Sequence, residues 1–198
     1  MRVPSRLKLT SIALATAAAL AACGGGDGPE PEETRAQDSR TFTADATAKT
    51  FAPMAAAPGD VVDMSTTSRW AGVLGNAAYR VEVPANWNGK LVMYAHGYRG
   101  TGAALTVSDP SIRRHLIQNG YAWAASSYST NYYDVRTGVE DTNALANEFT
   151  KIAAANQRTL AAPSRIYIMG HSMGGHVVGA AIDAEAASTA NNRTRYHG

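Results

Sequence analysis

Five consecutive residues have the types and spacing of a catalytic nucleophile site: Gly170-His171-Ser172-Met173-Gly174, which fits the pattern G-x-S-x-G. The β-rich pentapeptide RIYIM precedes them, and the small-residue run GHVVGAAIDAEAA follows without a break. A serine between a strand and a helix lies on a strained turn that exposes its hydroxyl, and its neighbours need to be nearly free of side chains. The two glycines meet that need. The pattern predicts that Ser172 is a nucleophile in acyl transfer; the alternative is a glycine-rich turn with an idle serine.

A second turn lies upstream in AHGYRG, residues 95–100, where a long apolar run ends. With these two turns the chain resembles the α/β-hydrolase family over roughly residues 69–190. The run PANWNGKLVMYAHGY is also similar to secreted bacterial esterases and depolymerases of that family. The resemblance implies that the backbone N–H groups of Tyr98 and Met173 form the oxyanion hole. The turn has the single-glycine form HGY and not HGGG, so we expect a hole that differs in detail.

Strand and helix patterns alternate along the part of the chain that would position these turns. We expect strands at residues 79–83, 91–97, 121–128 and 165–169, and helices at about 109–119 and 138–156. Asp109 (or Ser108) is the expected cap of the first helix, and Gly120 its end. This order predicts an α/β fold in which helices cover both faces of a mostly parallel sheet.

A serine needs a base, and the family order is Ser, then Asp or Glu, then His. After Ser172 the chain offers the acids Asp183 and Glu185, which we assign to the elbow helix, and the histidines His176 and His197. None of these makes a convincing acid–base pair. We therefore interpret the chain as the N-terminal portion of an α/β hydrolase, with the C-terminal strands, the acid and the histidine beyond residue 198. Upstream, the interpretation favoured for His96 is a structural hydrogen bond within its turn.

The N-terminus resembles a bacterial lipoprotein signal. A positive start and a short apolar run end in Leu20-Ala21-Ala22-Cys23, and Cys23 is the single cysteine of the chain. The resemblance implies cleavage after residue 22 and lipidation of Cys23, so the protein would be exported and anchored to a membrane. Gly24 favours the outer membrane or the cell surface. The alternative is an ordinary secretion signal with an incidental cysteine.

Composition bounds the remaining functional classes. Residues 23–60 are rich in Gly, Pro, Ala and acidic residues, which predicts a flexible tether before a domain at residues 61–198. Removing residues 1–22 leaves 15 basic and 16 acidic side chains, a balance that argues against nucleic acid as a partner. The His, Cys, Asp and Glu residues lack metal-ligand spacing, so we expect neither metal nor organic cofactor. The oligomeric state is left open.

Together these features predict an exported serine hydrolase that cleaves small-molecule or polymeric carboxylic esters. The aromatic run from Ser127 to Tyr133 follows an expected strand and could line the pocket for an aromatic ester. The alternative function is a non-catalytic lipoprotein, or an inactive hydrolase fragment, because the acid–base pair is missing.

Overall fold

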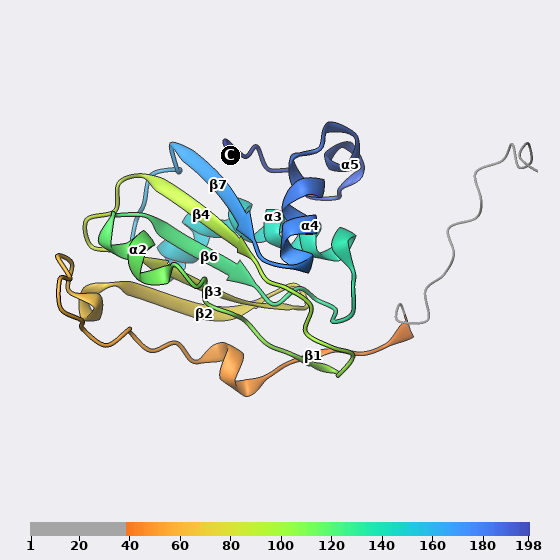
Figure 1. Ribbon diagram of the computed structural model, residues 1–198, viewed down its shortest axis with the longest axis horizontal. Coiled ribbons are helices and arrows are strands. Elements are labelled where there is room, and N and C mark those ends of the chain that lie inside the picture. Colours follow the sequence, from red (N-terminus) through yellow and green to blue (C-terminus); the bar gives the residue numbers. More distant parts are fainter. Residues whose placement is uncertain (1–38) are drawn as a thin grey trace, which may run out of the picture. The chain divides into compact units, whose positions relative to one another are not determined.

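The computed structural model describes residues 39–198, of which Thr41–Gly198 form one compact unit built on a five-stranded sheet (Figure 1). The sheet has the order β2-β3-β6-β4-β7. Its strands are β2 (Ser68–Leu74), β3 (Ala77–Val83), β6 (Ala122–Ser126), β4 (Lys90–Ala95) and β7 (Arg165–Gly170). The expected signal peptide, Cys23 and the first part of the expected tether lie outside the described residues.

The sheet is mixed, and β3 alone runs against the other four strands. The expected strands are all present, but the sequence analysis missed β2. That strand is joined to β3 by a two-residue hairpin, and Gly75 in the turn has a φ of 58°. A φ in this range costs glycine little and suits such short hairpins. The pairings of β6, β4 and β7 are parallel, as the alternation of helix and strand predicted.

Helices cover both faces of the sheet, as expected. Helices α3 (Val135–Ala155) and α4 (Met173–Ile182) pack on one face, where the core contains Met93, Ala124 and Phe149. Helix α2 (Arg113–Gln118) lies on the other face, where Val92 and Trp123 are buried. Adjacent strand residues thus enter different cores, because side chains alternate across a strand.

The expected tether boundary at residue 60 is wrong, because residues 41–60 are folded against the sheet. Strand β1 (Thr43–Ala44) pairs with β5 (Ala104–Leu105), and the short 3-10 helix η3 (Ala46–Lys49) buries Ala48. The Phe51 ring lies 5.4 Å from the Trp123 ring. Large apolar side chains are few in this segment, but Phe51 and Met54 are partly buried against the core on this face of the sheet. A second 3-10 helix, η4 (Met64–Thr66), leads into β2.

The expected cap of α2 is also wrong. The helix begins at Arg113, and Asp109 instead accepts hydrogen bonds from Arg80 and Arg113, each at 2.9 Å. Gly120 follows the helix with a φ of 76°, as expected of a helix end. The elbow helix is shorter than expected, because α4 ends at Ile182 and Asp183 caps a separate helix, α5 (Ala184–Thr189).

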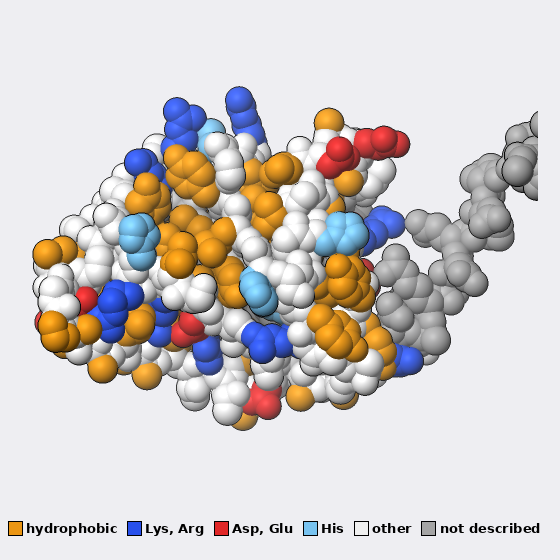
Figure 2. All heavy atoms as spheres, in the orientation of Figure 1, with side chains coloured by type: hydrophobic (Ala, Val, Ile, Leu, Met, Phe, Trp, Pro, Cys, Tyr) orange, Lys and Arg blue, Asp and Glu red, His pale blue; other side chains and the backbone are white. Residues whose placement is uncertain are grey.

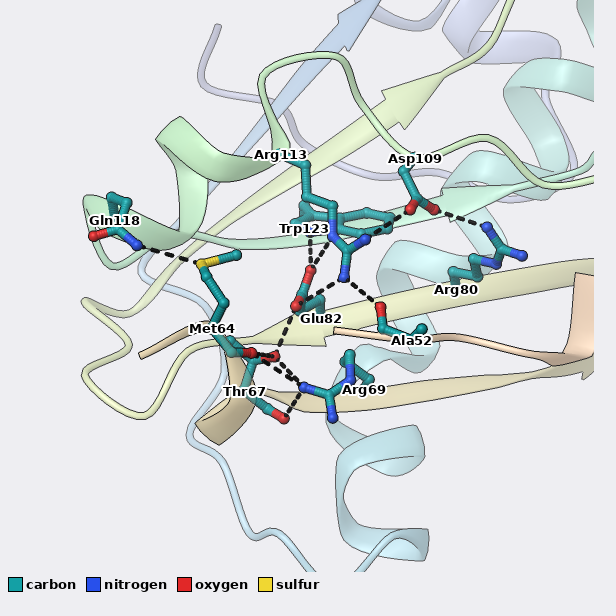
Figure 3. A network of polar contacts seen from close by, with 10 residues as sticks. All are labelled: Ala52, Met64, Thr67, Arg69, Arg80, Glu82, Asp109, Arg113, Gln118 and Trp123. Carbon is teal, nitrogen blue, oxygen red and sulfur yellow. Dashed lines mark hydrogen bonds and ion pairs between the residues drawn. The ribbon is translucent and has the colours of Figure 1, made fainter. Parts of the chain in front are cut away.

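A buried carboxylate ties these parts together (Figure 3). Glu82 on β3 is fully buried and accepts hydrogen bonds from Thr67 Oγ1 at 2.7 Å, Arg113 Nε at 2.6 Å and Trp123 Nε1 at 2.9 Å. Arg113 also donates to the carbonyl oxygen of Ala52 at 2.9 Å. One anion therefore links the sheet, α2 and the N-terminal segment.

Two surface properties bear on partners. Basic side chains are scattered over the face drawn in Figure 2 and do not form one stripe there. Within residues 39–198, none of the helices has the length and apolar character needed to span a bilayer.

Candidate active site

Ser172 lies on a sharp turn between β7, which ends at Gly170, and α4, which begins at Met173. Its φ of 56° and ψ of −125° are unusual for a residue with a side chain. Strain of this kind is about 1–3 kcal/mol and persists only where the surroundings enforce it. The Ser172 side chain is exposed. The turn thus presents a hydroxyl at the C-terminal end of β7, where open α/β sheets place their sites.

The two flanking glycines are required by close backbone contacts. A Cβ atom on Gly170 would lie 2.1 Å from the carbonyl oxygen of Gly174, and one on Gly174 would lie 2.0 Å from the carbonyl oxygen of Ala95. Both distances are far shorter than a van der Waals contact. The turn is therefore packed directly against the end of β4, which pairs with β7 in parallel.

The second turn meets the first in a small pocket. Its volume is ≈ 250 Å³, and it is lined by Tyr94, Gly97, Tyr98, Arg99, His171 and Ser172. A Cβ atom on Gly97 would lie 3.1 Å from the Cβ atom of Ser172, so the two turns are in contact. The pocket is thus built by Tyr94 near the end of β4 and by two short loops, one after each of two adjacent parallel strands.

The N–H groups expected to form the oxyanion hole belong to these same turns. Met173 is the first residue of α4, where a backbone N–H has no partner within the helix. Neither this N–H nor that of Tyr98 donates a hydrogen bond to any residue that the structure describes. Both groups are free to bind an anion, and the positive end of the helix dipole adds to the effect at Met173.

His96 is engaged by its own turn. It is 2% exposed, its ring is stacked on Tyr128 at 4.0 Å, and its nitrogens lie 2.6 Å from the Gly97 carbonyl oxygen and 3.0 Å from that of Ser127. Burial lowers the pKa of His96, so the ring is neutral near pH 7 and donates to one of the two carbonyls. The Tyr128 hydroxyl donates to the His96 carbonyl oxygen at 3.1 Å. These contacts hold the turn and leave His96 no nitrogen to act as a base for Ser172.

None of the histidines in residues 39–198 is hydrogen-bonded to the Ser172 side chain. His171 lines the pocket, and the His176 ring lies 6.0 Å from the exposed Tyr133 ring. His197 donates its backbone N–H to the Ile166 carbonyl oxygen at 2.8 Å, beside the start of β7. At about 3.3 Å per residue, Ile166 is roughly 13 Å from the end of the strand at Gly170. The backbone of His197 therefore lies near the opposite end of β7 from Ser172.

The acids near the pocket are committed to backbone groups. Asp134 accepts from the N–H of Thr137 at 3.1 Å and caps α3, and Asp141 accepts from the N–H of Ser129 at 2.6 Å. Burial raises the pKa of Asp141. None of the histidines in residues 39–198 is hydrogen-bonded to a carboxylate. Within the same residues, His, Cys, Asp and Glu side chains do not gather into a group that could hold a metal ion.

The strand order, the crossovers and the serine turn after β7 decide the architecture. The fold is an α/β-hydrolase fold. The structure describes five strands of its sheet, against the four that the sequence patterns indicated.

Comparisons with known proteins give similar folds at low identity. No protein-family model and no curated protein matches the sequence. Similar solved structures include esterase B from Lactobacillus Rhamnosis (20% identity, TM-score 0.40, covering 61% of this chain and 39% of that chain). A second is a thermostable esterase from Pseudomonas putida ECU1011 (20% identity, TM-score 0.40, covering 65% of this chain and 42% of that chain). A third is brefeldin A esterase, a bacterial homologue of human hormone-sensitive lipase (23% identity, TM-score 0.39, covering 68% of this chain and 38% of that chain). The chain spans about two fifths of the length of these three structures.

Proposed function

We propose that this chain carries the nucleophile and the oxyanion hole of an exported serine hydrolase that acts on carboxylic esters. The strained backbone of Ser172, at the edge of a pocket that also contains Tyr98, is the observation that supports the proposal most strongly. A structural serine has no need of a φ of 56°, whereas a nucleophile gains exposure from it.

In the proposed reaction Ser172 Oγ attacks the carbonyl carbon of the ester and loses its proton to a base. The carbonyl oxygen becomes an oxyanion that the N–H groups of Tyr98 and Met173 bind. Each such donor contributes roughly 3 kcal/mol to the transition state. Collapse releases the alcohol, which takes up the proton, and leaves an acyl-serine. Water then attacks this ester, and the carboxylic acid and free Ser172 are regenerated.

We place the triad acid and histidine outside residues 39–198. Every described histidine is either held by backbone groups or without a carboxylate to orient it. The order Ser, acid, His puts both groups after Ser172 in the sequence, and we expect them on later strands of the same sheet.

A serine-reactive alkyl fluorophosphonate tests the nucleophile in the longest natural form of the protein. We expect one covalent adduct, on Ser172, because the probe needs an activated hydroxyl. Ser172→Ala abolishes the adduct, and the matched control Ser188→Ala, which removes an exposed serine on α5, leaves it intact. Labelling that persists in Ser172→Ala would sink the proposal.

We also propose that the protein is anchored by a lipid on Cys23. The support is the sequence pattern that ends at this cysteine. Detergent-phase partitioning of the protein expressed in a bacterium checks it, since two or more acyl chains hold a protein firmly in a membrane phase. We expect the wild type in the detergent phase and Cys23→Ser in the aqueous phase; equal partitioning of the two would contradict lipidation.

A non-catalytic lipoprotein is the second candidate, and the lack of a described acid–histidine pair favours it. The thermal unfolding of the 198-residue chain separates the alternatives. A cooperative transition favours a domain that is stable by itself, whereas a broad, non-cooperative one marks a hydrolase fragment that needs further strands.

A further inference from the structure

Arg99 lies on the turn after β4 and contributes a cation to the pocket that contains Ser172. Its side chain is exposed at the pocket that contains Ser172, and it forms no hydrogen bond or ion pair with any residue from 39 to 198. By contrast, Arg80 and Arg113 bind Asp109, and Arg114 binds Asp60. The pocket thus contains a cation that the described chain leaves unneutralised.

The surroundings of Arg99 do not provide an anion. The pocket is otherwise lined by two tyrosines, a glycine, a histidine and Ser172. On the neighbouring loop and α3, the carboxylates of Asp134 and Asp141 are held by backbone N–H groups. The charge of Arg99 acts on this region, since it contributes to the lowered pKa of His96, after the larger effect of burial. The pocket is therefore suited to a negative group.

We infer that Arg99 binds a carboxylate on the substrate, so that the pocket prefers an ester that carries a free carboxylate, such as a half-ester of a dicarboxylic acid, to a neutral ester. The inference rests on the proposed function for the assignment of the scissile ester to Ser172. Arg99 follows directly after Tyr98, the proposed oxyanion donor, so the carboxylate would lie a few bonds from the scissile carbonyl. The planar guanidinium matches the two oxygens of a carboxylate.

Solvent limits how much the ion pair between Arg99 and a substrate carboxylate adds to the binding affinity. An exposed ion pair is screened by water and salt and orders a long side chain, so it contributes far less than a buried pair. Two parallel hydrogen bonds in one pocket raise this contribution. We expect a preference of about tenfold at low ionic strength, decreasing as salt is added.

The test measures binding and does not require catalysis. Monomethyl glutarate, which has one free carboxylate, and dimethyl glutarate, which has none, are titrated into the full chain and followed by NMR at neutral pH. The half-ester should bind about tenfold more tightly, with shifts in the Arg99 side-chain signal. Arg99→Gln should remove the preference. Arg165→Gln removes another exposed arginine, at the far end of β7, and should retain it.

Each outcome decides the inference. Equal affinity of the wild type for the two esters, or a preference that survives in Arg99→Gln, overturns it. The proposed function is judged separately by fluorophosphonate labelling. If Ser172 is labelled but the half-ester is not preferred, the proposed hydrolase function stands and the proposed role of Arg99 is wrong. If the half-ester is preferred but Ser172 is not labelled, the pocket binds carboxylates and the proposed hydrolase function is wrong.

Discussion

Replacing Glu82 with glutamine should destabilise the fold strongly, although the two side chains have almost the same shape. The Glu82 carboxylate acts only as an acceptor in its hydrogen bonds. The donors are Thr67 Oγ1, two nitrogens of Arg113, and Trp123 Nε1. A glutamine offers one acceptor oxygen and turns an NH2 group toward the remaining donors. The substitution therefore leaves buried N–H groups without partners and Arg113 without its nearest anion (Figure 3).

The size of the effect follows from burial. Removing one partner of a buried ion pair costs about 3–5 kcal/mol. Arg113 keeps Asp109, whose oxygen is 2.9 Å from Nη1, so we expect the lower end, about 3 kcal/mol. For a domain of this size each kcal/mol lowers Tm by roughly 2–4 °C, which gives a decrease of about 6–12 °C.

Thermal and urea unfolding followed by circular dichroism measure this change. Asp109→Asn is the matched control: it removes a partly exposed carboxylate that also binds Arg113, and it should cost only about 1 kcal/mol. Hydrogen exchange in residues 41–54 should also quicken in Glu82→Gln, because Arg113 holds the Ala52 carbonyl. A Tm decrease no larger than that of Asp109→Asn would refute the assignment of Glu82 as the central anion.

Three further predictions concern the site. Ser172→Gly should raise the free energy of unfolding by about 1 kcal/mol by relieving the positive φ, whereas Ser172→Ala should not; urea unfolding of the two variants compares them. Gly174→Ala should cost about 3 kcal/mol or more, seen as a large loss of Tm or of soluble protein, because its Cβ meets the Ala95 carbonyl oxygen at 2.0 Å. Burial raises the pKa of Asp141, so its contribution to stability is present below pH 3.8 and is lost as the pH rises through its folded-state pKa. Asp141→Asn should therefore be more stable than the wild type at pH 7, with the difference vanishing in acid; a difference in Tm that does not change with pH would contradict this origin.

The sequence predicted the elements whose signals are local. The strand around Met93, the strand before Ser172 and the helix around Phe149 each carry a periodic apolar pattern, and each is present. Strand β2 was missed because its sequence, SRWAGVL, lacks a clear alternation and depends on pairing with β3. The fold of residues 41–60 could not be read either, since it depends on Phe51 meeting Trp123, far away in the sequence.

The pocket was predictable for a similar reason. Its two turns carry local glycine patterns, and parallel pairing of β4 with β7 brings their ends together. Arg99 had no such signal, because an unpaired cation is recognised only when its neighbours are known.

The proposed reaction has two parts, oxyanion binding and proton transfer, and they depend on different parts of the protein. The same carbonyl oxygen, that of Ala95, contacts the Gly174 backbone and accepts the N–H of His171 at 3.3 Å, so the end of β4 fixes the serine turn from both sides. Tyr128 and His96 in turn fix the loop that presents Tyr98. In the proposed mechanism, binding of the oxyanion thus depends on contacts around the ends of β4 and β7. Proton transfer in the proposed mechanism depends on a histidine that we place outside residues 39–198.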